Sequence, residues 1–297
     1  MLSIANYNMH CGMDGWGRPY DYLAAIASLD ADVIVLEEAW TVAGDDGGGQ
    51  AAEAARHLGY QIAAHTLGSG RRIRPQSVPA DANNTTTASW RPRPIWTDQN
   101  KALYMDGVRP VSARAQALPR WQEAEEGSWG IAVLVRPSLP IEATRLLPMR
   151  TLRADRVRRA ALVVDLTVGG QPISVAGTHM SHLLMGSHRN WADLRRQLGT
   201  SSSSSSSALA LALALARPDA VLAGDMNTWG PLVKRFMPGW KRAVVGPTWP
   251  AWRPHSQIDH ILVRGDAVRP VSGVVLPNSG SDHRPVRAEL DVGTASS

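Results

Sequence analysis

The chain has little of what cross-linked or membrane-spanning proteins need. Of its 297 residues only Cys11 is a cysteine, so no disulfide can form within it. Outside residues 200–216, no apolar run approaches the roughly 20 residues that cross a bilayer. No charged segment followed by an apolar one opens the chain, so we expect a monomer in the reducing cytoplasm.

Phenylalanine is also scarce, with one residue against 11 tryptophans. Charged residues make up 19% and hydrophobic residues 44%, which is typical of a soluble globular protein. The formal net charge of +5 mildly favours polyanionic partners, such as nucleic acid or anionic lipid. Arginine and tryptophan suit phosphates and planar bases, although a GC-rich codon bias would produce the same composition.

Short apolar runs recur along the chain between glycine, proline and polar segments. The patterns predict helices at 20–29 and 50–58, and strands at 2–8, 32–38, 60–64, 130–136, 159–168, 172–178, 220–223, 257–263, 271–276 and 285–292. Gly169-Gly170 between two of these runs predicts a hairpin. Many strands with a few helices indicate an α+β fold of packed sheets with helices outside.

Two segments break this pattern within what we interpret as a single domain, residues 1–297. Residues 66–127 contain six prolines and polar tracts, which predicts an irregular rim insertion. Residues 200–216 are a low-complexity segment of serines followed by alternating alanine and leucine. Strict alternation puts leucine all around a helix, so we expect the least stable helix here. The segment is either a synthetic placeholder or a natural insertion.

Polar side chains stand at the ends of several predicted strands. Asn8 ends the first run and Glu38 the second, while Asp225 and Asn227 follow the run at 220–223. Strand ends hold side chains rigidly and still reach solvent, so they suit a metal and its acid and base groups. Taken singly, each residue also has a plainer explanation, such as a turn or a salt bridge at a sheet edge.

Five segments together resemble the endonuclease/exonuclease/phosphatase family, whose fold is that of pancreatic deoxyribonuclease I. They are Asn6–His10, Asp32–Glu38, Gly177–Met180, Gly224–Asn227 and Ser281–Val286, with Ile258–His260 before the last. Their order covers residues 2–292. The resemblance implies a four-layer α/β/β/α sandwich with two packed, mostly antiparallel sheets flanked by helices.

The resemblance also implies a role for each polar residue. Glu38, Asn8 and Asp282 would hold Mg²⁺, with Mn²⁺ as an alternative, since hard cations prefer oxygen ligands. His283 would be the general base, with Asp259 behind it to fix its tautomer. The remaining catalytic or substrate-binding residues would be Asp225, Asn227, His179 and Arg284. The family usually has glutamine where this chain has Glu37, which should point to the opposite face from Glu38.

The expected activity is metal-dependent hydrolysis of a phosphoester by in-line attack of water. A phosphodiesterase or nuclease is favoured because basic and aromatic residues interleave at 66–127 and 229–256. Such residues fit an anionic membrane almost as well, so a lipid or phosphoinositide phosphoesterase is the alternative. A catalytically inactive binding module on the same scaffold is a third interpretation.

Overall fold

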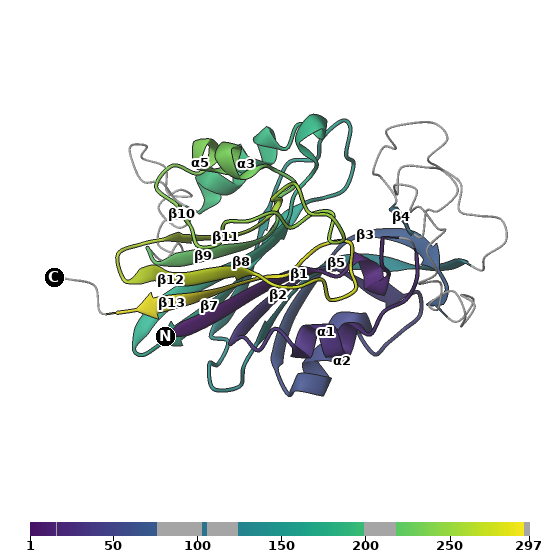
Figure 1. Cartoon of the computed structure of the whole chain (residues 1–297), viewed down its shortest axis with the longest axis horizontal. Coiled ribbons are helices and arrows are strands. Elements are labelled where there is room, and N and C mark those ends of the chain that lie inside the picture. The colour runs from purple at the N-terminus through teal and green to yellow at the C-terminus, as the bar shows by residue number, and fades with distance from the viewer. Residues whose placement is uncertain (16, 76–102, 106–123, 199–217, 294–297) are drawn as a thin grey trace.

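Two β-sheets packed face to face form the centre of the protein (Figure 1). The computed structural model describes residues 1–15, 17–75, 103–105, 124–198 and 218–293. One sheet has seven strands, in the order β12 (Val268–Val275), β13 (Val286–Val292), β1 (Leu2–Asn8), β2 (Val33–Val42), β5 (Ala124–Val135), β3 (Gln61–Ile73) and β4 (Leu103–Met105). The other has six, in the order β10 (Lys241–Arg242), β11 (Asp259–Arg264), β9 (Ala220–Asp225), β8 (Gln171–His179), β7 (Ala160–Val168) and β6 (Ala143–Pro148).

Helices cover the outer face of each sheet. The seven-stranded sheet carries α1 (Tyr22–Ala27) and α2 (Gly49–Leu58), and the six-stranded sheet carries α3 (His188–Gln197) and α5 (Gly230–Phe236) (Figure 1). All described strand pairs are antiparallel except β1 with β2 and β8 with β9. The predicted four-layer α+β sandwich is therefore confirmed. No helix among the described residues is long and apolar enough to cross a membrane.

The continuous apolar run of β2 follows from burial on both faces. Val33 and Val35 pack in the core between the sheets, while Ile34 and Leu36 pack against the helix layer. Side chains of a strand alternate between its two faces, so a strand buried on both sides has no polar position to spare. Glu37 and Glu38 interrupt the apolar run in the middle of β2, where the register with β5 shifts.

The predicted hairpin at Gly169-Gly170 is confirmed, since both glycines have positive φ and join β7 to β8. The prediction of an irregular segment from 66 to 127 is wrong at both ends. Residues 66–73 continue β3 and residues 124–127 begin β5, and the two strands pair along this stretch. They form a ribbon with polar and glycine positions, so hydrophobic alternation did not reveal it. Residues 76–102 and 106–123, and the low-complexity segment 200–216, lie outside the described residues.

Gly177 sets how closely the sheets approach beneath the strand ends. A Cβ atom there would lie 2.8 Å from Cγ1 of Val35 and 3.2 Å from Cγ2 of Val133 on the opposite sheet. Gly177→Ala should therefore lower the free energy of unfolding by about 1–3 kcal/mol through overpacking. Urea denaturation measures this change. Gly293→Ala is the matched control, because nothing lies within 4 Å of a Cβ at that position. An equal loss of unfolding free energy in both variants would contradict overpacking at Gly177.

Candidate functional site

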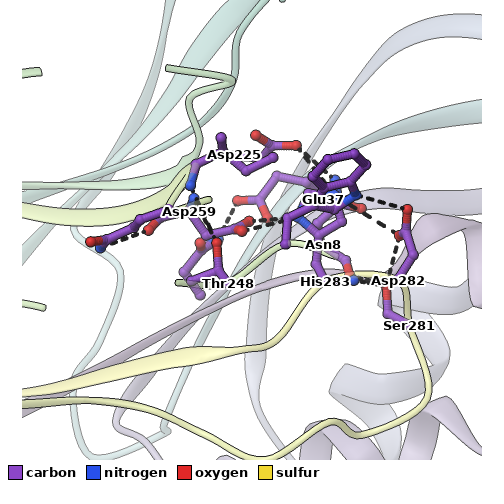
Figure 2. Close-up of polar contacts among 12 residues, drawn as sticks. Asn8, Glu37, Asp225, Thr248, Asp259, Ser281, Asp282 and His283 are labelled. Carbon is purple, nitrogen blue, oxygen red and sulfur yellow. Dashed lines mark hydrogen bonds and ion pairs between the residues drawn. The ribbon is translucent and has the colours of Figure 1, made fainter. Parts of the chain in front are cut away.

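The polar residues of both sheets converge at one edge of the sandwich (Figure 2). The ends of β1 and β8 lie beside their parallel neighbours: Asn8 lies opposite Glu37 in register, and His179 lies opposite Asp225 at the end of β9. The predicted strand end at Glu38 is wrong, because β2 continues to Val42. The start of β11 completes the edge, because Asp259 pairs with Asp225. Residues that are far apart in sequence thus meet where the strands of both sheets end.

His283 and Asp259 form a buried pair. Nδ1 of His283 lies 3.0 Å from each carboxylate oxygen of Asp259. This contact places the proton on Nδ1 and leaves Nε2 directed at the carboxylates of Asp225, 3.8 Å away, and Asp282, 3.9 Å away. Burial alone would lower the pKa of His283, but the charges of Asp259, Asp282 and Asp225 raise it well above its ordinary value. The arrangement suits a histidine that accepts a proton at Nε2.

Asp225 lies at the centre of the cluster. Its Oδ2 accepts a hydrogen bond of 3.1 Å from Nδ2 of Asn8, and its Oδ1 accepts one of 2.9 Å from the backbone N–H of Asn227. Burial raises the pKa of Asp225 to about 7; His283 opposes this rise, whereas Asp259 and Glu38 add to it. A carboxyl group that titrates near neutrality can both orient a water molecule and donate a proton.

A β-bulge in β2 brings Glu38 to the site. The register with β5 shifts between Glu37 and Ala39, and Glu38 has φ of 51°, a conformation that side chains other than glycine rarely adopt. Oε1 of Glu38 accepts from Nδ2 of Asn8 at 3.4 Å and lies 3.8 Å from Nε2 of His179. Its Oε2 is buried without a hydrogen-bond partner among the described residues. The bulge thus aims an extra carboxylate at the cluster.

The prediction that Glu37 points away from Glu38 is wrong, because the bulge interrupts the alternation. Glu37 is fully buried among the side chains of the cluster and accepts a hydrogen bond of 2.5 Å from Nδ2 of Asn6 (Figure 2). Burial raises the pKa of Glu37 well above its usual range, and the nearby Asp259 and Asp225 raise it further. Glu37 therefore supports the cluster as a neutral hydrogen-bonding group.

Asp282 lies on the loop before β13, which is tied to β1. The backbone N–H of Ser281 donates to the hydroxyl of Tyr7, and the Ser281 hydroxyl donates to the carbonyl of Asn8. Burial acts to raise the pKa of Asp282, but the facing His10 and His283 lower it below its usual value. Asp282 is therefore an ionised carboxylate held beside Asn8 and Glu38.

Asn227 and His179 present nitrogen atoms to the same space. Nδ2 of Asn227 donates to the carbonyl of Met180 at 3.0 Å and lies 3.4 Å from Nε2 of His179. Nε2 of His179 is also 3.6 Å from Oδ2 of Asp225. Burial, the positive charge of Arg159 and that of His283 hold the pKa of His179 well below its usual value. His179 is thus neutral and can donate one hydrogen bond to an anionic group.

Sequence reasoning missed the support behind His179. The guanidinium of Arg159 donates to the His179 carbonyl at 3.4 Å, pairs with the fully buried Asp155 at 3.0 Å, and stacks 5.1 Å from the ring of Trp129. The Trp129 ring lies 5.7 Å from the His179 ring. A buried ion pair contributes little net stability, so we assign this pair to positioning His179. The only sign of this support in the sequence was an arginine at the start of the predicted strand 159–168.

Arg284 does not point into the cluster. Its Nε donates to the carbonyl of Ala251 at 2.8 Å, and its backbone N–H donates to the carbonyl of Thr248. Thr248 in turn accepts from the N–H of Asp259 at 3.3 Å. Arg284 therefore fastens the neighbouring loop to the strand that carries Asp259, and its role in substrate binding stays a prediction.

The site contains two groups of possible metal ligands. Ligand atoms of Asp225, Asp259 and His283 lie within 4.8 Å of one another. Both carboxylate oxygens of Asp259, however, already contact Nδ1 of His283. We therefore assign this pair to proton transfer and not to metal binding. The unpartnered Oε2 of Glu38, together with the carboxylate of Asp282 and the Asn8 side chain, offers the oxygen ligands that a hard divalent cation prefers.

A model of the endonuclease/exonuclease/phosphatase family matches residues 5–283. The chain belongs to this family. Its members are phosphoester hydrolases, and the chain has a buried cluster of acidic residues and histidine. No curated protein sequence matches the chain significantly.

Solved structures of family members share the fold. An endonuclease/exonuclease/phosphatase from Beutenbergia cavernae is 21% identical, with a TM-score of 0.60, over 99% of this chain and 72% of that one. The human Nocturnin catalytic domain with bound sulfate is 14% identical, with a TM-score of 0.60, over 98% and 93%. A mannosyl-6-phosphatase from Bacteroides thetaiotaomicron is 14% identical, with a TM-score of 0.54, over 98% and 99%. The activities in their names differ, so the shared fold does not select a substrate.

The charge around His283 predicts its titration. In metal-free protein the imidazole should lose its proton at a pH above the usual value of about 6.5, because three carboxylates face it. The protonated form then stabilises the fold fully below about pH 6.5, and this contribution disappears as the pH rises through the folded pKa. Ring ¹⁵N shifts in NMR measure the midpoint. Asp259→Asn should lower it, and an unchanged midpoint in that variant would contradict the pairing.

Proposed function

We propose that the protein is a divalent-metal-dependent phosphodiesterase that cleaves nucleic acid by in-line attack of water on phosphorus. The observation that carries this proposal is the His283–Asp259 pair, whose Nε2 faces the carboxylates of Asp225 and Asp282. A histidine with a buried carboxylate behind it is a proton acceptor of the kind needed to activate water.

The chain's own residues divide the work between proton transfer and stabilisation of charge. The neutral form of His283 takes a proton at Nε2 from the attacking water, and Asp259 stabilises the imidazolium that results. The facing carboxylates favour the imidazolium in the metal-free protein, so positive charge bound beside them would be needed to favour the neutral form. Asp225 orients that water or protonates the leaving oxygen, which its pKa of about 7 allows. Asn227 and the neutral His179 donate hydrogen bonds to the phosphoryl oxygens, where negative charge accumulates in the transition state.

Glu38, Asp282 and Asn8 are the residues that would hold Mg²⁺ or Mn²⁺. The buried and unpartnered Oε2 of Glu38 supports this assignment, because an isolated carboxylate oxygen in such a position is costly without a cation. A bound divalent ion would supply positive charge next to the phosphoryl group. Nδ1 of His10 lies 3.7 Å from Oδ1 of Asp282 and places a further imidazole beside this carboxylate.

A lipid phosphoesterase is the second candidate, because two apolar side chains are exposed on loops that follow catalytic strands. Leu184 after β8 is 86% exposed, and Trp229 after β9 is 53% exposed. Exposed apolar groups beside a catalytic site can enter the edge of a bilayer. A panel of DNA, RNA, phosphoinositide and sphingomyelin substrates separates the candidates. Cleavage of lipid vesicles without action on nucleic acid would overturn our first choice.

Removal of the proton acceptor should abolish most of the activity. His283→Ala is expected to reduce kcat by ~10²–10⁴-fold, the usual contribution of a general base. Asp225→Asn should cause a loss of similar size. His260→Gln is the matched control, because His260 is also buried but its Nε2 bonds to the carbonyl of Thr228 and not to a carboxylate. Turnover of bis(4-nitrophenyl) phosphate gives kcat, and circular dichroism checks folding. Near-wild-type turnover in His283→Ala would remove that residue from the mechanism.

Metal removal provides an independent prediction. Dialysis against EDTA should eliminate hydrolysis, and added Mg²⁺ or Mn²⁺ should restore it. Glu38→Gln should weaken the metal's effect, so that a higher concentration is needed for half-maximal activity, since it removes one anionic ligand. Full activity in EDTA, with no metal detected by mass spectrometry, would contradict metal dependence and leave the His283 test unaffected.

A further inference from the structure

A cleft between α5 and β10 lies outside the catalytic cluster. It has a volume of about 430 Å³ and is lined by cations and apolar groups: Lys234, Lys241, Arg242, Met237, Trp240 and Val245, with Gly239. None of these described lining residues is acidic, and residues 226–258 contain no aspartate or glutamate. Three positive charges thus share a recess without a carboxylate among its lining residues, which is the electrostatic signature of an anion site.

Arg242 is the most deeply set of the three cations. Its guanidinium donates to Oε1 of Gln257 and packs over Gly230, and its Nε is buried without a hydrogen-bond partner among the described residues. Partial burial lowers the pKa of Arg242 from its ordinary value, although the group stays charged at neutral pH. An anion in the cleft would stabilise this desolvated cation.

A hydrogen bond and a strand pairing link the cleft to the catalytic centre. Gln257, which holds Arg242, also donates to the carbonyl of Asp259. In the sheet, Arg242 lies opposite Leu262, three residues beyond Asp259 on the same strand. Three residues at a rise of about 3.3 Å each place the backbone of Arg242 roughly 10 Å from Asp259 along the strand. That distance corresponds to about three nucleotides of a stacked strand at 3.4 Å each.

We propose that this cleft binds a second phosphate of a nucleic-acid strand, a few nucleotides from the bond that is cleaved. The inference rests on the proposed function and adds a binding site for the rest of the substrate. A strand is favoured over a membrane because the cations line a recess and its tryptophan, Trp240, is only 7% exposed. Peripheral membrane sites instead present protruding aromatic side chains.

The test compares a short and a long substrate. In the Lys234→Gln/Lys241→Gln double variant, KM for an oligothymidylate octamer should rise by ~10-fold relative to KM for bis(4-nitrophenyl) phosphate, because the small diester cannot reach the cleft. The dependence of octamer binding on salt should also weaken, by a slope of about one for each phosphate that is no longer bound. Arg195→Gln is the matched control, because Arg195 is an exposed cation on α3, outside the cleft and outside residues 229–256.

Binding of the octamer to the His283→Ala protein, followed by fluorescence anisotropy, keeps the inference testable if hydrolysis fails. If wild-type protein cleaves no phosphodiester, the proposed function fails, while loss of octamer affinity in the cleft variant still supports the site. An unchanged octamer KM, or an equal rise in Arg195→Gln, would overturn the site. Loss of binding to phosphatidylserine vesicles, with octamer affinity unchanged, would also overturn it and assign the cleft to a membrane.

Discussion

Repulsion between buried carboxylates is the constraint on which this structure depends. Glu37, Glu38, Asp225, Asp259 and Asp282 are all nearly inaccessible to water and lie within one cluster. The protein relieves the repulsion by several means at once. Protons remain on Glu37, His283 carries a compensating positive charge, and Asn6 and Asn8 donate hydrogen bonds. A cluster that is only partly neutralised by protein groups is suited to accept a cation and a reacting phosphate.

The two parallel strand pairs give this cluster its rigidity. β8 and β9 end together at His179 and Asp225, whereas β1 ends at Asn8 opposite Glu37 and β2 continues to Val42. The cluster therefore takes residues from the ends of β1, β8 and β9 and from the bulge within β2, and the core between the sheets holds these strands at a fixed separation. Asp282 and His283 come from the loop before β13 instead.

The sequence predicted the layers and named most of the residues that the structure brings together, although the roles of these residues stay predictions. Apolar runs ending in Asn8 and Asp225 marked strand ends, whereas β2 continues past Glu38 to Val42. The bulge at Glu38 could not be predicted, since it inserts one residue into an otherwise regular alternation and has no compositional marker. The ribbon at 66–73 was missed because it carries no hydrophobic periodicity. Asp155 and Arg159 are only four residues apart, but the contact of Arg159 with the His179 carbonyl joins the residue before β7 to the end of β8 and is not encoded by sequence spacing.

The pairing of β1 with β13 has a consequence for synthesis of the protein. The first strand of the chain lies between β13 and β2, so the seven-stranded sheet is incomplete until the last strand has left the ribosome. The loop that carries Asp282 and His283 immediately precedes β13 and is fastened to the end of β1. Contacts between such distant parts of a chain form late and slowly. A nascent chain that has not yet released β13 from the ribosome therefore lacks the assembled cluster.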